Sequence, residues 1–175
     1  FWDAQSGGFY FTSEDHKDLL ARNKPTYDGS EPSGNSMAAL GLLRLARLSG
    51  NPEYFERAKR TLEVLYESMA RTPRAHLKLV CALDFYLYPP KEIAIVGPRN
   101  GEAVEQFLKV VHGRFVPNKV LALLDPSQGD TTIVERQIPL LAGKKLKGGR
   151  AAVYVCKDYT CLEPVTSAEA LRTAL

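Results

Sequence analysis

The sequence changes character at Pro89-Pro90, and this change constrains the fold more than any other feature. Before the two prolines, long segments repeat apolar residues every three or four positions, which is typical of helices. After them, short β-branched runs alternate with helical stretches, which is typical of an α/β arrangement. We therefore expect a helical domain over residues 1–89 and a small α/β module over residues 90–175.

Three helices are predicted in the first part. The first, from Ser33 to Leu48, is apolar over most of its circumference, which indicates packing on several sides. The second opens at Asn51-Pro52, with Asn as the cap and Pro at the first helical position, and is amphipathic. The third follows Pro73, from Arg74 to about Tyr86. Its expected inward residues are Leu77, Val80, Cys81, Leu83 and Phe85. An inner helix followed by an outer helix forms an αα-hairpin.

The second part is predicted to hold a three-stranded sheet. Residues 93–96 form a continuous apolar run, as expected for a strand buried on both faces. A helix over residues 102–114 and a second apolar run at 120–124 complete a parallel βαβ unit. A third run follows at 152–156, and a short helix closes the chain at 168–175. The Gly97–Gly101 loop lacks a phosphate-binding spacing and is interpreted as a structural turn.

Composition excludes several classes of protein. A chain that is 45% hydrophobic can bury a core, yet no apolar run approaches the ~20 residues of a membrane span, so no membrane contact is expected. The 23 basic residues are nearly balanced by 20 acidic ones, so no nucleic-acid partner is expected. Residue 1 is Phe, which indicates a piece of a longer chain. Without a visible signal peptide, a cytoplasmic protein with reduced thiols is expected.

Cys156 and Cys161 are the redox candidates. Their Cys-x4-Cys spacing allows a redox pair or half of a metal site, but the simpler interpretation is two thiols that flank a turn. Four-ligand zinc needs further partners, and the three histidines lack ligand spacing, so we expect no metal and no cofactor.

The polar residues of the first part are the candidates for a ligand-binding cavity. They surround two glycine-containing turns, one of which leads into the first helix. Such residues either cap the helix or line a cavity at its N-terminus. The candidates are Asp3, Asp28, Ser33, Asn35 and Ser36. Asp3 and Asp28 could act as acid and base, although the sequence does not show that they meet. The aromatic residues that could stack on a sugar are Trp2, Phe9, Tyr10, Phe11 and Tyr27.

Two stretches make the chain resemble a known family. They are residues 1–12, FWDAQSGGFYFT, and residues 27–36, YDGSEPSGNS, and the later segments 117–119 and 155–166 agree with them. The chain resembles the C-terminal part of the thioredoxin-domain-containing family that includes spermatogenesis-associated proteins. Members combine a thioredoxin-like domain with an (α/α)6 toroid similar to N-acylglucosamine 2-epimerases and six-hairpin glycosidases.

The resemblance implies that residues 1–89 are the last hairpins of that toroid. The Asp-Gly-x-x-Pro-Ser-Gly-Asn-Ser motif, residues 28–36, would face its cavity, and a sugar-like molecule would be the partner. The thioredoxin-like domain and most of the toroid lie outside this sequence. The fragment is therefore not expected to be catalytic alone, and the parent protein would be sugar-isomerase-like or glycosidase-like.

Two other functions remain open at this point. The chain could be a redox-linked accessory that works through Cys156 and Cys161, or a non-catalytic interaction module. A helical remnant separated from its neighbours should also expose Leu40, Leu43 and Leu83 and self-associate to cover them.

Overall fold

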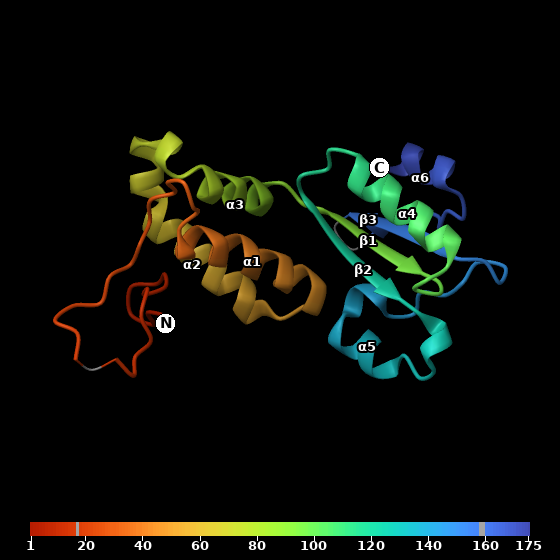
Figure 1. The fold of residues 1–175 in the computed structure, drawn as a ribbon, viewed down its shortest axis with the longest axis horizontal. Helices are drawn as coiled ribbons and strands as arrows, with labels where there is room; N and C mark the ends of the chain where they lie inside the picture. Colours follow the sequence, from red (N-terminus) through yellow and green to blue (C-terminus); the bar gives the residue numbers. More distant parts are fainter. Residues whose placement is uncertain (17, 158–159) are drawn as a thin grey trace. The chain divides into compact units, whose positions relative to one another are not determined.

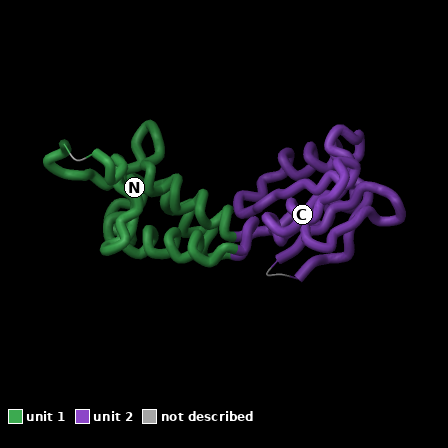
Figure 2. The backbone as a smooth tube through the Cα atoms, turned by 90° about the horizontal axis from the view of Figure 1, so that it is seen from below, with its two compact units in different colours: residues 1–46, 51–88 green, residues 47–50, 89–175 purple. Residues whose placement is uncertain are grey.

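The structure is a computed structural model that describes residues 1–16, 18–157 and 160–175. It divides into two compact units, residues 1–46 with 51–88 and residues 47–50 with 89–175 (Figure 2). The chain combines helices with one mixed sheet, so its class is α+β. The toroid to which the helices are expected to belong, and the domain boundary at residue 90, stay predictions.

The first unit is built on three helices, α1 (Gly34–Ser49), α2 (Pro52–Arg71) and α3 (Leu77–Leu87) (Figure 1). The predicted local caps are present. The Ser33 hydroxyl accepts a hydrogen bond from the Ser36 amide, and the Asn51 side chain accepts one from the Glu53 amide. Both bonds satisfy amides that the first turn of a helix leaves without a partner.

The inward face of α3 differs from the prediction. A 3₁₀ turn (Pro73–Ala75) precedes it, and its buried residues are Leu79, Ala82 and Phe85. Cys81 is exposed, and Leu77 is 62% exposed, so both were assigned to the wrong face. The helix is apolar on two sides, and periodicity alone does not tell which of two apolar faces is inward.

The expected exposure of Leu40 and Leu43 is also wrong. The two side chains are 5% and 2% exposed, because they form part of the core of the first unit. Leu83 is half-buried. The large apolar side chains of α1 that are exposed are Met37, 50% exposed, and Leu45, 48% exposed.

The second unit contains a four-stranded sheet of order β2-β1-β3-β4. Its strands are β1 (Lys91–Val96), β2 (Lys119–Leu124), β3 (Ala152–Lys157) and β4 (Thr160–Cys161). The parallel pairing of β1 with β2 confirms the predicted βαβ unit, whereas β3 is antiparallel to β1. The expectation of three strands is wrong, since the sheet has β4 as a fourth strand. Sequence analysis missed β4 because a strand of two residues is too short to show an apolar pattern.

Helices pack against the sheet through a continuous apolar core. Residues of β1 and β3 contact α4 (Glu102–Gly113) and α6 (Ala168–Ala174), with Phe107 and Leu171 at most 1% exposed. Figure 1 shows α4 and α6 side by side on one side of the sheet, and α5 (Thr132–Gln137) near the end of β2. Residues 92–96 of β1 are all buried, as expected for a central strand.

Candidate functional site

The Asp28 carboxylate joins the starts of two helices. Its Oδ1 accepts a hydrogen bond from the Ser33 amide at 2.8 Å, directly before α1. Its Oδ2 accepts from the amides of Lys78 at 2.8 Å and Leu79 at 3.2 Å, in the first turn of α3. His76, at the cap position of α3, makes no side-chain capping bond. Asp28 therefore caps α3 from a position about 50 residues earlier in the chain.

Opposing effects set the pKa of Asp28. Burial raises it, but the amides of Ser33, Leu79 and Lys78 and the Ser36 hydroxyl together hold the pKa below its ordinary value. The carboxylate is thus ionised at neutral pH, and its negative charge lies where the helix dipoles favour it.

Ser33 and Ser36 lie beside this carboxylate and are both buried. Their hydroxyl oxygens are 2.9 Å apart, and the Ser36 amide donates to the Ser33 hydroxyl at 3.1 Å. The predicted candidates Asp28, Ser33 and Ser36 therefore form one hydrogen-bonded group at the start of α1.

Asn35 has a separate role, since its side chain holds the N-terminal segment against α1. Its Oδ1 accepts from the Phe9 amide at 2.7 Å, and its Nδ2 donates to the carbonyls of Phe9 at 2.9 Å and Pro25 at 2.8 Å. The side chain is buried, and these bonds replace those that it would make with water.

Asp3 is the centre of a second hydrogen-bonded group. It accepts from the amides of Gln5 and Ser6, from the hydroxyls of Ser6 and Tyr10, and from the Lys24 ammonium. The Lys24 ammonium and the Ser6 hydroxyl hold the pKa of the Asp3 carboxyl far below its usual range.

Asp3 and Asp28 do not form an acid–base pair in this structure. The hydrogen bonds described for them involve different partners, and both carboxyls are ionised at neutral pH. A general acid needs a proton at working pH, so neither carboxyl supplies one from this arrangement. Binding of a sugar by the cavity candidates stays a prediction.

The aromatic residues separate into packed and exposed ones. Trp2 packs on Phe9, with ring centroids 5.0 Å apart, and the Arg22 guanidinium lies 3.9 Å from the centre of the Tyr10 ring. Phe11 and Tyr27 are 74% and 67% exposed. Only these two of the five predicted stacking residues therefore present most of their surface to solvent.

His76 is a buried residue whose place the sequence did not indicate. Its Nε2 lies 3.0 Å from the Ser68 hydroxyl, and its Nδ1 lies 3.0 Å from the Thr72 carbonyl. These contacts satisfy both ring nitrogens inside the protein. Within the described residues, no group of three or more His, Cys, Asp and Glu side chains is arranged to hold a metal.

Cys156 and Cys161 form a disulfide between β3 and β4. They are register partners in the antiparallel pair, with Cα atoms 3.9 Å apart, so the expectation of reduced thiols does not agree with the structure. The β3–β4 hairpin brings the two side chains together, although neither lies in a Cys-x-x-Cys motif. Cys156 is buried and Cys161 exposed.

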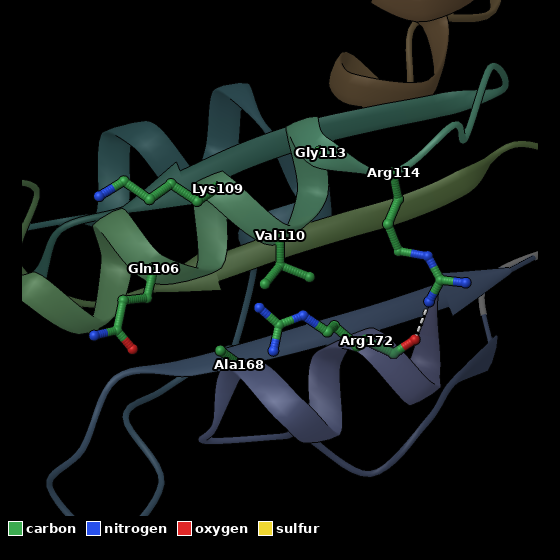
Figure 3. Close-up of a pocket in the computed structure, with 7 residues that line it drawn as sticks. All are labelled: Gln106, Lys109, Val110, Gly113, Arg114, Ala168 and Arg172. Atoms are coloured by element: carbon green, nitrogen blue, oxygen red, sulfur yellow. Dashed lines mark hydrogen bonds between the residues drawn. The ribbon is translucent and has the colours of Figure 1, made fainter.

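Two pockets in the second unit were not predicted. The first lies between α4 and α6, has a volume of about 450 Å³ and is lined by Lys109, Arg114 and Arg172 among others (Figure 3). Lys109 pairs with Glu105 at 2.7 Å, and Arg114 donates to the Arg172 carbonyl, so two of the three cations already have partners. The second, of about 460 Å³, lies at the carboxyl end of β2.

Comparison with known proteins gives relatives that are much longer than the chain. It is 36% identical to human spermatogenesis-associated protein 20 and 37% identical to the rat protein, over its full length in both cases. It is 25% identical to an uncharacterized protein of Caenorhabditis elegans over 98% of its length. The chain spans 22% of the length of each of these relatives. No protein-family model matches it.

No helix in the described part of the chain is both long and apolar enough to cross a membrane.

The resemblance to spermatogenesis-associated proteins that the two motifs predict is confirmed, whereas a thioredoxin-like domain and a toroid stay predictions. From end to end, the chain is similar to one part of spermatogenesis-associated protein 20.

Proposed function

We propose that the chain is the C-terminal part of a longer protein in which residues 1–89 complete an (α/α)6 toroid, and that the toroid's cavity binds a carbohydrate-like molecule. The similarity to 22% of the length of spermatogenesis-associated protein 20 supports the first half of this proposal. The arrangement of α1 and α3 supports the toroid, and the exposed aromatic ring of Tyr27 supports the carbohydrate-like ligand.

The observation that carries the proposal is the shared Asp28 carboxylate. Because it accepts bonds from the amides at the start of α1 and of α3, both helices begin at the same place, with α2 between them in the chain. Repeated hairpins of inner and outer helices have this alternation. The half-exposed Met37 and Leu45 give α1 a second apolar surface, as expected for an inner helix with neighbours on several sides.

A ligand in the cavity would meet Tyr27, which precedes Asp28 and is 67% exposed. An aromatic ring offers an apolar face to the C–H groups of a sugar, and its hydroxyl offers a hydrogen bond. Asp3 and Asp28 are engaged in hydrogen bonds within the protein. Their role would therefore be to hold the segments next to the ligand in place, and not to contact the ligand. Any isomerase or glycosidase chemistry would use groups from the rest of the longer protein.

Isothermal titration of the full-length protein tests this function. The titrants are glucose, mannose, N-acetylglucosamine and the 6-phosphate of each. At least one should bind, and Tyr27→Ala should weaken its binding about tenfold, the effect of losing ~1.4 kcal/mol. Tyr66→Ala is the matched control, because Tyr66 is 59% exposed on α2 and should leave binding unchanged. The absence of heat with every sugar would favour a non-catalytic interaction module.

The disulfide favours a second candidate function. A redox-linked accessory needs a thiol pair that can be oxidised and reduced, and Cys156 and Cys161 are bonded in the structure with Cys161 exposed. Exchange with a dithiol partner would break this bond and leave both cysteines reduced while the partner is oxidised.

A further inference from the structure

The pocket at the carboxyl end of β2 lies where open α/β sheets bind ligands. β1 and β2 are parallel neighbours, and their carboxyl ends meet at one edge of the sheet. Ligands of such folds lie outside the carboxyl ends of parallel strands. The pocket has a volume of about 460 Å³, which is within the range of sites for small molecules.

Asp125 connects the two loops that form the pocket. It follows β2 directly, and its Oδ2 accepts a hydrogen bond from the Arg99 amide at 2.8 Å. Its Oδ1 accepts from the Ser127 amide at 2.9 Å and from the Ser127 hydroxyl at 2.6 Å. The β1–α4 loop is thereby held against the end of β2, and the Arg99 side chain becomes part of the pocket lining.

The pocket contains a cation and an acceptor, Arg99 and Asp130, that both have hydrogen-bonding capacity left. Within the described residues, the Arg99 guanidinium makes no hydrogen bond or ion pair, and only the Arg99 amide is engaged. Asp130 accepts bonds from the Thr132 amide and hydroxyl at Oδ1, and no described residue donates to its Oδ2. Leu123 and Val134 add apolar surface to the same lining.

We propose that this pocket binds a small molecule in which vicinal hydroxyls of a sugar ring lie next to a phosphate. The Asp130 carboxylate accepts hydrogen bonds from the hydroxyls, as acidic side chains at the ends of strands do for ribose. The Arg99 guanidinium donates to the phosphate in a bidentate geometry. The apolar lining contacts the C–H face of the ring.

The composition of the pocket discriminates against simple anions. Two carboxylates lie with one guanidinium in the lining, so a bare phosphate gains one favourable charge contact and meets repulsion from Asp125 and Asp130. A sugar phosphate compensates this repulsion because its hydroxyls donate to the Asp130 carboxylate. The inference concerns the second unit alone and does not rest on the function proposed for the helical unit.

The test is isothermal titration of the 175-residue chain with three probes: ribose 5-phosphate, 2-deoxyribose 5-phosphate and inorganic phosphate. Ribose 5-phosphate should bind, and the deoxy sugar, which lacks one vicinal hydroxyl, should bind about tenfold more weakly. Inorganic phosphate should bind more weakly still. Arg99→Ala and Asp130→Asn should each weaken binding of ribose 5-phosphate by about tenfold or more.

Lys109→Ala is the matched control, because Lys109 is an exposed cation in the other pocket, and it should leave the affinity unchanged. Amide chemical shifts provide a second measurement that also reports folding of the variants, and ribose 5-phosphate should shift the Ser127 and Thr131 amides. Failure of ribose 5-phosphate to bind would overturn the proposal. So would equal affinity for inorganic phosphate, or unchanged affinity in Arg99→Ala.

Discussion

At the scale of single residues, Asp28 is the group on which the starts of two helices depend. Its two oxygens accept three backbone amides, from Ser33, Lys78 and Leu79. A buried or half-buried amide that loses its acceptor costs free energy, because water does not fully replace the bond. The same carboxylate was a candidate for ligand binding in the sequence, since capping and cavity-lining residues have the same chemistry.

Replacing this carboxylate should destabilise the chain at neutral pH. Asp28→Asn keeps the size but loses the charge and one acceptor oxygen, and we expect a loss of about 1–3 kcal/mol in the free energy of unfolding. Urea denaturation followed by circular dichroism measures it. Glu31→Gln is the matched control, an exposed carboxyl three residues away that should change stability by less than about 0.5 kcal/mol.

The effect of Asp28→Asn should depend on pH in a definite direction. The pKa of Asp28 is lower in the folded chain than its ordinary value, so the ionised carboxylate stabilises the fold above the pKa of an unfolded Asp, about 3.9. This contribution is lost as the pH falls through the lowered pKa. The difference between wild type and variant should therefore stay constant above about pH 5 and shrink over the interval from about pH 5 to about pH 2. A difference that stays constant over this interval would contradict the assignment.

At the scale of elements, the β3–β4 hairpin shows how a short edge strand is held. β4 has two residues, which give little pairing on their own, and its Cys161 is linked covalently to the buried Cys156. On the β1 side of β3, a full register of pairs forms from Glu92↔Cys156 to Val96↔Ala152. The disulfide therefore anchors the sheet edge at its weakest strand.

Thiol counting should detect this bond. In denaturant without reductant, one of the three cysteines, Cys81, should react with Ellman's reagent, and all three should react after reduction. Cys161→Ser should leave Cys81 and a buried Cys156, the latter reacting only on unfolding, with a loss of about 2 kcal/mol or less for so short a loop. Three reactive thiols that persist after treatment with a mild oxidant would show that the bond does not form, and the redox candidate would lose its basis.

At the scale of the whole molecule, α1 leaves two large apolar side chains exposed, and we expect them to affect association of the chain. Met37 and Leu45 are half-exposed and two helical turns apart, so they lie on one side of the helix. Removing exposed apolar side chains from water is favourable, so two such surfaces tend to associate.

The isolated chain should therefore self-associate in a concentration-dependent way. Sedimentation velocity measures the association, and Met37→Lys with Leu45→Lys should shift the chain to monomer because two charges resist burial. Val64→Lys is the control, since Val64 is 44% exposed on α2 and should not affect association. A wild-type chain that stays monomeric at all concentrations would argue against a role for this surface in packing.

The features that the sequence predicted are those fixed by neighbours in the chain. The Asn51 cap with Pro52, the Ser33 cap and the parallel βαβ unit all appear as expected. Each depends on residues a few positions apart or on an apolar run long enough to identify a buried strand. The two motifs that indicated the spermatogenesis-associated relatives are likewise contiguous segments.

Only the tertiary structure decided which face of α3 is buried, how Cys156 meets Cys161, and what Asp3, Asp28 and Asn35 contact. Asn35 reaches Phe9 across 26 positions, and Asp28 reaches Lys78 across 50. A buried polar group needs a hydrogen-bond partner, and that partner can come from a segment that is distant in the sequence but close in the folded chain. From the sequence alone, therefore, most of the long helices and strands and the similarity to spermatogenesis-associated proteins could be predicted. The tertiary structure decided which polar residues hold distant segments together, because their hydrogen-bond partners lie far away in the chain.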